Sequence, residues 1–219
     1  MVSSDDLNLM TDDLRLETLL VIGTDTGVGK TVFSGLFARY LMDAGVGVRA
    51  VKPFCSGGIE DVEFLADAQR GLGQEDLNYW YSKEPVSPAA VELRVGQAVD
   101  FESCVEWVKS RPPSVSSGQG VGQQSAGGVR QAGVLLVEGV GGLLAPLAKG
   151  RTVASLGQAL EAELIVVAPN RVGVINQVLL TVEAAAKRGL RVACVVLMGQ
   201  READLSSLDN AALILDFSP

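Results

Sequence analysis

The feature that most constrains this chain is the stretch LLVIGTDTGVGKT at residues 19–31. An apolar run typical of a β-strand ends at Gly23, a loop of small residues follows, and residues 32–42 are predicted to form a helix. A strand, a glycine-bearing loop ending in Lys-Thr and a helix, in this order, build a phosphate-binding loop. Backbone N–H groups and the positive end of the helix dipole then hold a polyanion. The stretch therefore predicts a nucleotide-phosphate site, with Lys30 on the outer phosphates and Thr31 as a Mg²⁺ ligand.

The loop differs from the usual pattern of such sites at one position. The first glycine of the pattern is separated from the Gly-Lys pair by four residues, which would place it at Thr24, but the chain has its glycine one position earlier. We expect the phosphate cradle to extend over the whole loop. Its residues are Gly23, Thr24, Asp25, Thr26, Gly27, Val28, Gly29, Lys30 and Thr31.

The composition favours an α/β fold in one domain over residues 1–219. Apolar residues make up 47% of the chain and aromatic residues 5%, which is typical of a buried parallel sheet covered by helices. Predicted strands alternate with predicted helices, so we expect a P-loop NTPase-like sheet, mainly parallel, with helices on both faces. The acidic residues 1–17 are predicted to be a solvated tail, and the Gly, Ser and Gln-rich residues 111–131 a flexible surface loop. Further strands are expected at 48–51, 133–137, 164–168 and 192–197, and helices at 61–72, 101–110, 152–160 and 174–188.

Charge and residue usage exclude several classes of function. The formal net charge of −8 argues against general binding to nucleic acid. The chain has no histidine, which removes histidine bases, Ser-His triads and histidine metal sites. Three widely spaced cysteines, Cys55, Cys104 and Cys194, indicate reduced thiols in a cytoplasmic protein. The acidic N-terminal segment lacks the features of a signal peptide, and no apolar run approaches the length of a membrane span.

Charged side chains follow two other predicted strands. Lys52 stands at the carboxyl end of strand 48–51, and Glu138 directly follows strand 133–137. Because ligands bind outside the carboxyl ends of strands in open α/β sheets, we expect both residues near the phosphate loop. Thr31, Asp61 and Glu138 supply oxygens of the kind that Mg²⁺ prefers. Residues 54–61 are predicted to be a flexible loop lining the site, and residues 78–88 an irregular stretch.

Four sequence blocks carry a resemblance to a known family. GTDTGVGKT, VKPFCSGG, LLVEGVGGLLAPL and NRVGVINQVLLT, spread over residues 19–181, together resemble ATP-dependent dethiobiotin synthetase. In that family 7,8-diaminopelargonate takes up CO₂ as a carbamate, which attacks the γ-phosphate of ATP. The second amine then closes a ureido ring and expels phosphate. The resemblance implies that the substrate supplies its own nucleophile, which suits a chain without histidine.

The resemblance also implies roles for individual residues. Thr26, Lys30, Lys52 and Ser56 would hold the phosphates and the carbamate, and Thr31, Asp61 and Glu138 would hold Mg²⁺. The block that follows strand 133–137 adds Gly139, Gly141 and Gly142 to the nucleotide site. Backbone amides at the helix start Gly173, Val174, Ile175 and Asn176 would bind the substrate carboxylate across the interface of a homodimer.

One departure and three alternatives remain open at this point. The family has an Asn that reads the adenine ring after the last strand, where this chain has Leu197, Met198 and Gly199, so base preference is undetermined. A partitioning ATPase of related fold has a lysine early in the loop, at the position of Asp25. A glutamine-dependent amide synthetase needs a glutaminase domain, for which 219 residues leave no room. A paralogue that binds nucleotide without making product is the third alternative.

Overall fold

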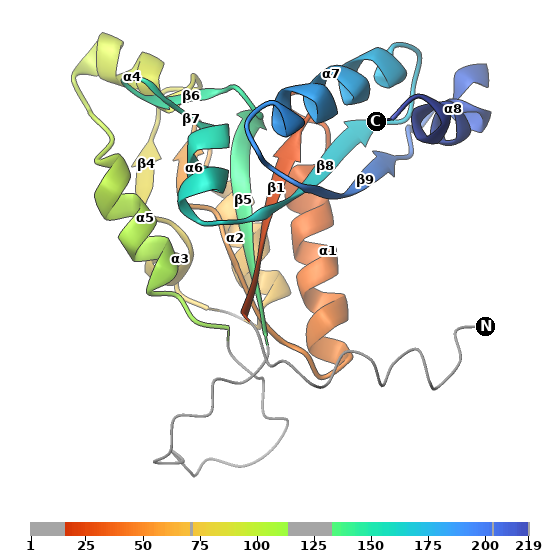
Figure 1. Cartoon of the computed structure of the whole chain (residues 1–219). Helices are drawn as coiled ribbons and strands as arrows, with labels where there is room; N and C mark the ends of the chain where they lie inside the picture. Colours follow the sequence, from red (N-terminus) through yellow and green to blue (C-terminus); the bar gives the residue numbers. More distant parts are fainter. Residues whose placement is uncertain (1–15, 71, 114–132, 203, 219) are drawn as a thin grey trace.

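The computed structural model of the chain describes residues 16–70, 72–113, 133–202 and 204–218. Its centre is a five-stranded sheet in the order β2-β5-β1-β8-β9, and every neighbouring pair in it is parallel (Figure 1). The sequence predicted such a sheet, and this prediction is confirmed. The strands are β1 (Leu16–Gly23), β2 (Gly47–Val51), β5 (Gly133–Gly142), β8 (Glu163–Pro169) and β9 (Val192–Met198).

Helices connect these strands and cover the sheet. From β1 the chain crosses to β2 in one direction, whereas from β5 it crosses to β8 in the other. Since such crossovers are right-handed, α1 and α6 lie on opposite faces. Figure 1 shows α6 in front of the sheet and α2 behind it. The helices are α1 (Lys30–Asp43), α2 (Glu60–Ala68), α3 (Gln74–Leu77), α4 (Pro88–Val95), α5 (Phe101–Lys109), α6 (Val153–Ala159), α7 (Val174–Ala186), the 3₁₀ helix η2 (Leu205–Leu208) and α8 (Asn210–Phe217).

The core lies between the central strands and the helices on both faces. Leu20, Val21 and Ile22, consecutive residues of β1, are each 0% exposed, so both faces of this strand are covered. This explains why the strand is a continuous apolar run rather than an alternating one. Gly157 of α6 lies against Leu20 and Leu164, where a Cβ would be 3.2 Å from the first side chain. A small residue therefore lets the helix approach the sheet closely.

Two short sheets were not predicted. Residues 54–56 form strand β3 (Phe54–Ser56), which pairs in parallel with β4 (Trp80–Ser82). The predictions of a flexible loop over 54–61 and an irregular stretch over 78–88 were therefore wrong at these residues. Strands β6 (Pro146–Ala148) and β7 (Arg151–Thr152) form an antiparallel pair. A three-residue strand is too short to show a hydrophobic period in the sequence. Such a strand forms only because a neighbouring strand pairs with it.

Element ends also differ from the predictions. Strand β1 begins at Leu16, inside the predicted acidic tail, and β5 continues to Gly142, so that Glu138 lies within the strand rather than after it. Helix α1 begins at Lys30, which places the Lys-Thr pair in its first turn. The rest of the predicted tail, and residues 114–131 of the predicted surface loop, lie outside the described residues. No helix in the described part of the chain combines the length and apolar character needed to cross a membrane.

Candidate active site

The phosphate loop joins β1 to α1 at the carboxyl edge of the sheet. At Gly23 an added Cβ would lie 2.4 Å from the Asp25 carbonyl oxygen, so only glycine fits there. This explains the shifted glycine: the Asp25 carbonyl lies too close to residue 23 for any side chain there. The Thr24 amide donates to the Val167 carbonyl at 3.0 Å, which ties the loop to β8. The loop is thus held by the neighbouring strand through its backbone.

Lys30 lies at the start of α1 and is 7% exposed. Its ammonium donates to the carbonyl oxygen of Asp25 at 3.1 Å, so the side chain folds back across the loop. Burial lowers the pKa of Lys30 below its ordinary value, and the nearby Lys52 lowers it further against the attraction of Glu138. An anion entering the loop would relieve both effects, since it supplies the opposite charge that the buried ammonium lacks.

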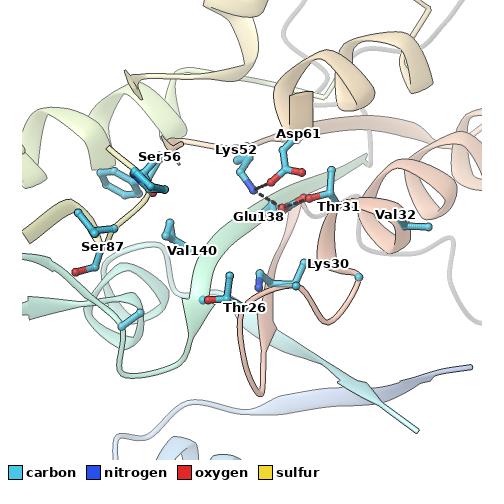
Figure 2. A pocket seen from close by; sticks show the side chains of 17 residues that line it. Thr26, Lys30, Thr31, Val32, Lys52, Ser56, Asp61, Ser87, Glu138 and Val140 are labelled. Atoms are coloured by element: carbon cyan, nitrogen blue, oxygen red, sulfur yellow. Dashed lines mark hydrogen bonds and ion pairs between the residues drawn. The ribbon is translucent and has the colours of Figure 1, made fainter. Parts of the chain in front are cut away.

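Thr31, Lys52, Asp61 and Glu138 form one polar cluster beside the loop (Figure 2). The Lys52 ammonium donates to Glu138 Oε1 at 2.6 Å and to Asp61 Oδ2 at 2.7 Å. The Thr31 hydroxyl donates to the same Glu138 oxygen at 2.7 Å. Residues up to 107 positions apart in the chain therefore meet at one carboxylate.

The cluster is asymmetric in its exposure to solvent. The side chains of Lys52 and Glu138 are 7% and 1% exposed, whereas that of Asp61 is 52% exposed. Although burial disfavours its charge, the carboxylates of Glu138 and Asp61 raise the pKa of Lys52. Burial likewise opposes ionisation of Asp61, but Lys52 lowers the pKa of this carboxyl. Both shifts keep the groups charged around neutral pH.

The residues present fit a divalent cation bound beside a phosphate chain. Glu138 Oε2 is buried and has no hydrogen-bond partner among the described residues, which is costly unless a cation or a bound water meets it. Asp61 and Thr31 bring further oxygens to the same place, and Mg²⁺ needs few protein ligands when phosphates and water complete its shell. No group of three or more His, Cys, Asp or Glu residues within the described ranges could hold a metal without such help.

A cavity of about 460 Å³ opens between the loop, the polar cluster and the segment before α4. Of the predicted site residues, the cavity is lined by Thr26, Gly27, Gly29, Lys30, Thr31, Lys52, Ser56, Asp61, Glu138 and Gly141. Its lining does not include Gly23, Thr24, Asp25, Val28, Gly139, Gly142, Gly173, Val174, Ile175 and Asn176.

Sequence reasoning missed one wall of this cavity. Pro85, Val86 and Ser87 line it, and Figure 2 shows Ser87 and Ser56 on the side opposite Lys30. Ser87 directly precedes Pro88, the first residue of α4. A Ser-Pro pair is a recognised signal for the start of a helix and could have indicated this element. Nothing in the local sequence indicates that the helix start faces the phosphate loop.

Two further predicted regions can be placed. Helix α7 begins after Gly173, which has a φ of 91°, and both Gly173 and Asn176 are exposed. Met198, in the segment where the resembling family has its adenine-reading Asn, approaches the phosphate loop. A Cβ added to Gly29 would lie 3.0 Å from Met198 Cε. An apolar thioether side chain, which has no hydrogen-bond donor, therefore packs against the loop here.

A parallel α/β sheet whose first strand leads into a glycine-bearing loop, with a buried lysine followed by a threonine at the start of the next helix, defines a P-loop nucleotide-binding protein. Residues 17–219 match the family described as an AAA domain. Two solved structures share the fold: chloroplast FtsY from Physcomitrella patens, with a TM-score of 0.50 and 15% identity over 94% of this chain, and FtsY from Thermotoga maritima, with a TM-score of 0.50 and 14% identity over 97% of it. This chain spans 57% and 65% of those two chains.

Relatives of known name are closer in sequence. The ATP-dependent dethiobiotin synthetase BioD of Methanococcus vannielii is 32% identical over 82% of this chain and 77% of its own length. The protein of the same name from Anaeromyxobacter dehalogenans (strain 2CP-C) is 36% identical over 82% and 75%, and that from Bacillus subtilis (strain 168) is 32% identical over 82% and 73%. The chain belongs to the family of ATP-dependent dethiobiotin synthetases, which are ligases. The membership of this family that the four sequence blocks indicated is confirmed.

Proposed function

We propose that this protein is an ATP-dependent dethiobiotin synthetase of biotin biosynthesis. An amine of 7,8-diaminopelargonate forms a bond to CO₂ and loses a proton, giving a carbamate. A carbamate oxygen attacks the γ-phosphorus of ATP, the bond to ADP breaks, and a carbamic-phosphoric anhydride results. The second amine attacks the carbamate carbon, closes the ureido ring and expels phosphate. Each step uses a group of the substrate as nucleophile, so the protein must orient groups and stabilise charge.

The observation that carries the proposal is the convergence of two buried ammonium groups on one cavity. Lys30 and Lys52 are 7% and 5% exposed and both line it. Phosphoryl transfer spreads negative charge over the transferred group, and cations already in position stabilise that charge without reorganisation. In this role Lys30 and the loop amides hold the phosphates, whereas Lys52, with Thr26 and Ser56, orients the carbamate.

Thr31, Asp61 and Glu138 would hold Mg²⁺ beside the phosphates. The ion would neutralise charge on the phosphate oxygens, as divalent cations do in related nucleotide sites. The support from this chain is the buried, unpartnered Glu138 Oε2. Lys52 contacts both carboxylates of this set and would share them with the ion.

The substrate carboxylate would bind to the backbone amides of residues 173–176 in a second copy of the chain. These residues are absent from the lining of the cavity in the described part of their own chain, which supports a site completed by a partner protomer. We therefore propose a homodimer with shared sites. The three free cysteines, Cys55, Cys104 and Cys194, support a reducing, cytoplasmic location.

The test is a product assay. Protein, bicarbonate, Mg²⁺, 7,8-diaminopelargonate and one nucleoside triphosphate at a time are mixed, and the ureido product is sought by mass spectrometry. We expect product with ATP, and loss of product on omission of either bicarbonate or the diamine. Tight nucleotide binding by calorimetry without any product would overturn the proposal and favour a nucleotide-binding paralogue instead.

A further inference from the structure

Lys52 lies outside both sheets that flank it. Strand β2 ends at Val51, paired with Val137, and strand β3 begins at Phe54, paired with Trp80. Lys52 and Pro53 connect the two strands, and neither is paired in a strand ladder with any residue of the described ranges. The ladder that fixes the backbone of Val51 therefore stops one residue before the lysine whose ammonium must be placed accurately.

Hydrogen bonds with the turn at residues 77–80 hold the backbone of Lys52 instead. The Lys52 amide donates to the Leu77 carbonyl at 2.8 Å. The Asn78 carboxamide nitrogen donates to the Lys52 carbonyl at 2.8 Å, to the Trp80 carbonyl at 3.2 Å and, more weakly, to the Pro53 carbonyl at 3.4 Å. Both backbone polar groups of Lys52 are thus bonded to the turn that joins α3 to β4.

The side chain of Asn78 is itself held in place. Its backbone amide donates to the Gln74 carbonyl at 2.9 Å, which closes helix α3, and its backbone is extended with a φ of −128° and a ψ of 131°. The amides of Tyr79 and Trp80 both donate to the Pro53 carbonyl, at 3.2 and 2.9 Å. The turn thus bonds the amide and the carbonyl of Lys52 and the carbonyl of Pro53. We therefore expect the position of the Lys52–Pro53 segment to depend on that of Asn78.

We propose that Asn78 is a positioning residue for Lys52. This inference rests on the proposed function, because it takes Lys52 as the group that orients the carbamate. Lys52 Nζ keeps two contacts of 2.6 and 2.7 Å with Glu138 and Asp61, and these hold only while its backbone stays in place. Without the Asn78 donor, the buried Lys52 carbonyl lacks this partner and the segment shifts to find another. A displacement of about 1 Å at a reacting group can lower turnover about 10²-fold.

The chain contains a matched control. Gln69 is 5% exposed, and its carboxamide bonds the amide and the carbonyl of Ala50, at 2.8 and 2.9 Å, and the Leu65 carbonyl at 3.0 Å. It therefore holds strand β2 at a point two residues before Lys52, with as many hydrogen bonds as the Asn78 side chain makes. However, Ala50 is also paired with Leu136 in the sheet, so its position does not depend on the side chain alone.

Asn78→Ala, Asn78→Asp and Gln69→Ala are compared with the unmutated protein. Asp has the size of Asn but presents an acceptor oxygen where Asn has its donor nitrogen. If Asn78 only filled space, Asn78→Asp would therefore keep its kcat. We expect kcat for the ureido product to fall about 10- to 100-fold in both Asn78 variants, with KM for ATP unchanged within about twofold, because the phosphate loop is untouched. Gln69→Ala should keep kcat while its Tm falls by a few degrees, about 2–4 °C.

A second readout does not depend on activity. Limiting acetic anhydride acetylates exposed amines, and the modified fraction of Lys52 is measured by peptide mass spectrometry. We expect Lys52 to react several times faster in both Asn78 variants than in the unmutated protein and in Gln69→Ala. Should Asn78→Ala not fold, Asn78→Asp, which also lacks the donor, carries both measurements alone.

The outcomes separate the two proposals. If the unmutated protein makes the ureido product but the Asn78 variants keep its kcat and its Lys52 reactivity, the positioning role is overturned. It is also overturned if Gln69→Ala shows the same losses. If the unmutated protein makes no product while Lys52 becomes reactive in the Asn78 variants alone, the positioning role stands and the proposed reaction fails.

Discussion

Helices α1 and α7 begin alike and differ in what surrounds their first turns. Each follows a strand of the central sheet, β1 or β8, and these two strands are parallel neighbours. Each is preceded by a glycine with positive φ, 99° at Gly29 and 91° at Gly173. Both helices therefore present backbone amides and a positive dipole end at the same edge of the sheet, although at α7 the Val174 amide already donates to the Arg171 carbonyl at 3.1 Å.

Their surroundings decide what each start can do. The first turn of α1 opens into the cavity, with Lys30 inside it and the Lys52–Glu138 pair across from it. The first turn of α7 carries the exposed Asn176 and lines no part of that cavity. A helix start becomes a site when other strands bring charges to it. The charge that the described part of the chain brings beside the α7 start is the acidic Asp204, which accepts from the Val172 amide, and no cation comes with it from the cavity. We therefore propose that a second protomer completes this site.

The largest expected effect is at α1. Lys30→Met removes a buried cation from the phosphate site, and kcat/KM for ATP should fall about 10²- to 10³-fold. Steady-state assay of the ureido product measures this. Lys187→Met, directly after the end of α7, is the control, since its ammonium pairs with Glu183 in solvent. Retained turnover in Lys30→Met would contradict the role assigned to the loop.

The paired glycines allow a direct test of the comparison. Alanine at either position meets a backbone strain of about 1–2 kcal/mol. At Gly29 the new Cβ would also press on Met198, 3.0 Å away, whereas at Gly173 none of the atoms that the structure describes lies within 4 Å of it. By calorimetry, Gly29→Ala should bind ATP about 5- to 30-fold more weakly. Gly173→Ala should bind ATP normally and raise KM for 7,8-diaminopelargonate. The comparison fails if the two variants exchange these effects.

A smaller effect is expected from the exposed face of α7. Leu180 is 58% exposed, and in a homodimer joined through this helix Leu180→Glu would remove an apolar side chain from the interface, whose burial stabilises by about 1.5–3 kcal/mol. Sedimentation velocity should show more monomer, with ATP binding intact. Leu36→Glu on α1, where the leucine is 63% exposed, is the matched control and should leave the assembly unchanged. An unaltered sedimentation profile for Leu180→Glu would place the interface elsewhere.

The smallest expected effect is on stability, through the loops that lead into α1 and α7. The α1 loop is tied by the Thr24 backbone amide, whereas the α7 loop is tied by the Asp204 carboxylate, which accepts from the Val172 amide at 2.8 Å. Hydrogen bonds from Ser206 and Val172 lower the pKa of Asp204. Its contribution to stability is thus complete above the ordinary pKa of about 4 and is lost as the pH falls through the lower folded value.

Asp204→Asn should therefore be less stable than the unmutated protein at pH 6 and nearly as stable at pH 2. Urea midpoints at the two pH values measure the difference. An equal difference between the two urea midpoints at pH 6 and at pH 2 would show that the charge of Asp204 does not hold the loop.

Much of this architecture could be predicted because the signals are local. The phosphate loop is read from nine consecutive residues, and β8 from a short apolar run. The strand-end rule for parallel sheets brought Lys52 and Glu138 near the loop before any contact was known. The wall at Ser87, the β3–β4 pair and the turn at Asn78 could not be predicted, because each depends on a segment that is distant in the chain and has no periodicity of its own.

The sequence by itself determined the α/β order, the phosphate loop and the absence of histidine chemistry. Each depends on residue type and on neighbours within about one element. Only the tertiary structure decided that Lys52 pairs with a glutamate 86 residues away, and that the lysine backbone is held by Asn78 rather than by a strand. Such contacts depend on which strands become neighbours. That is settled by the packing of the whole core, in which many distant side chains must be buried together.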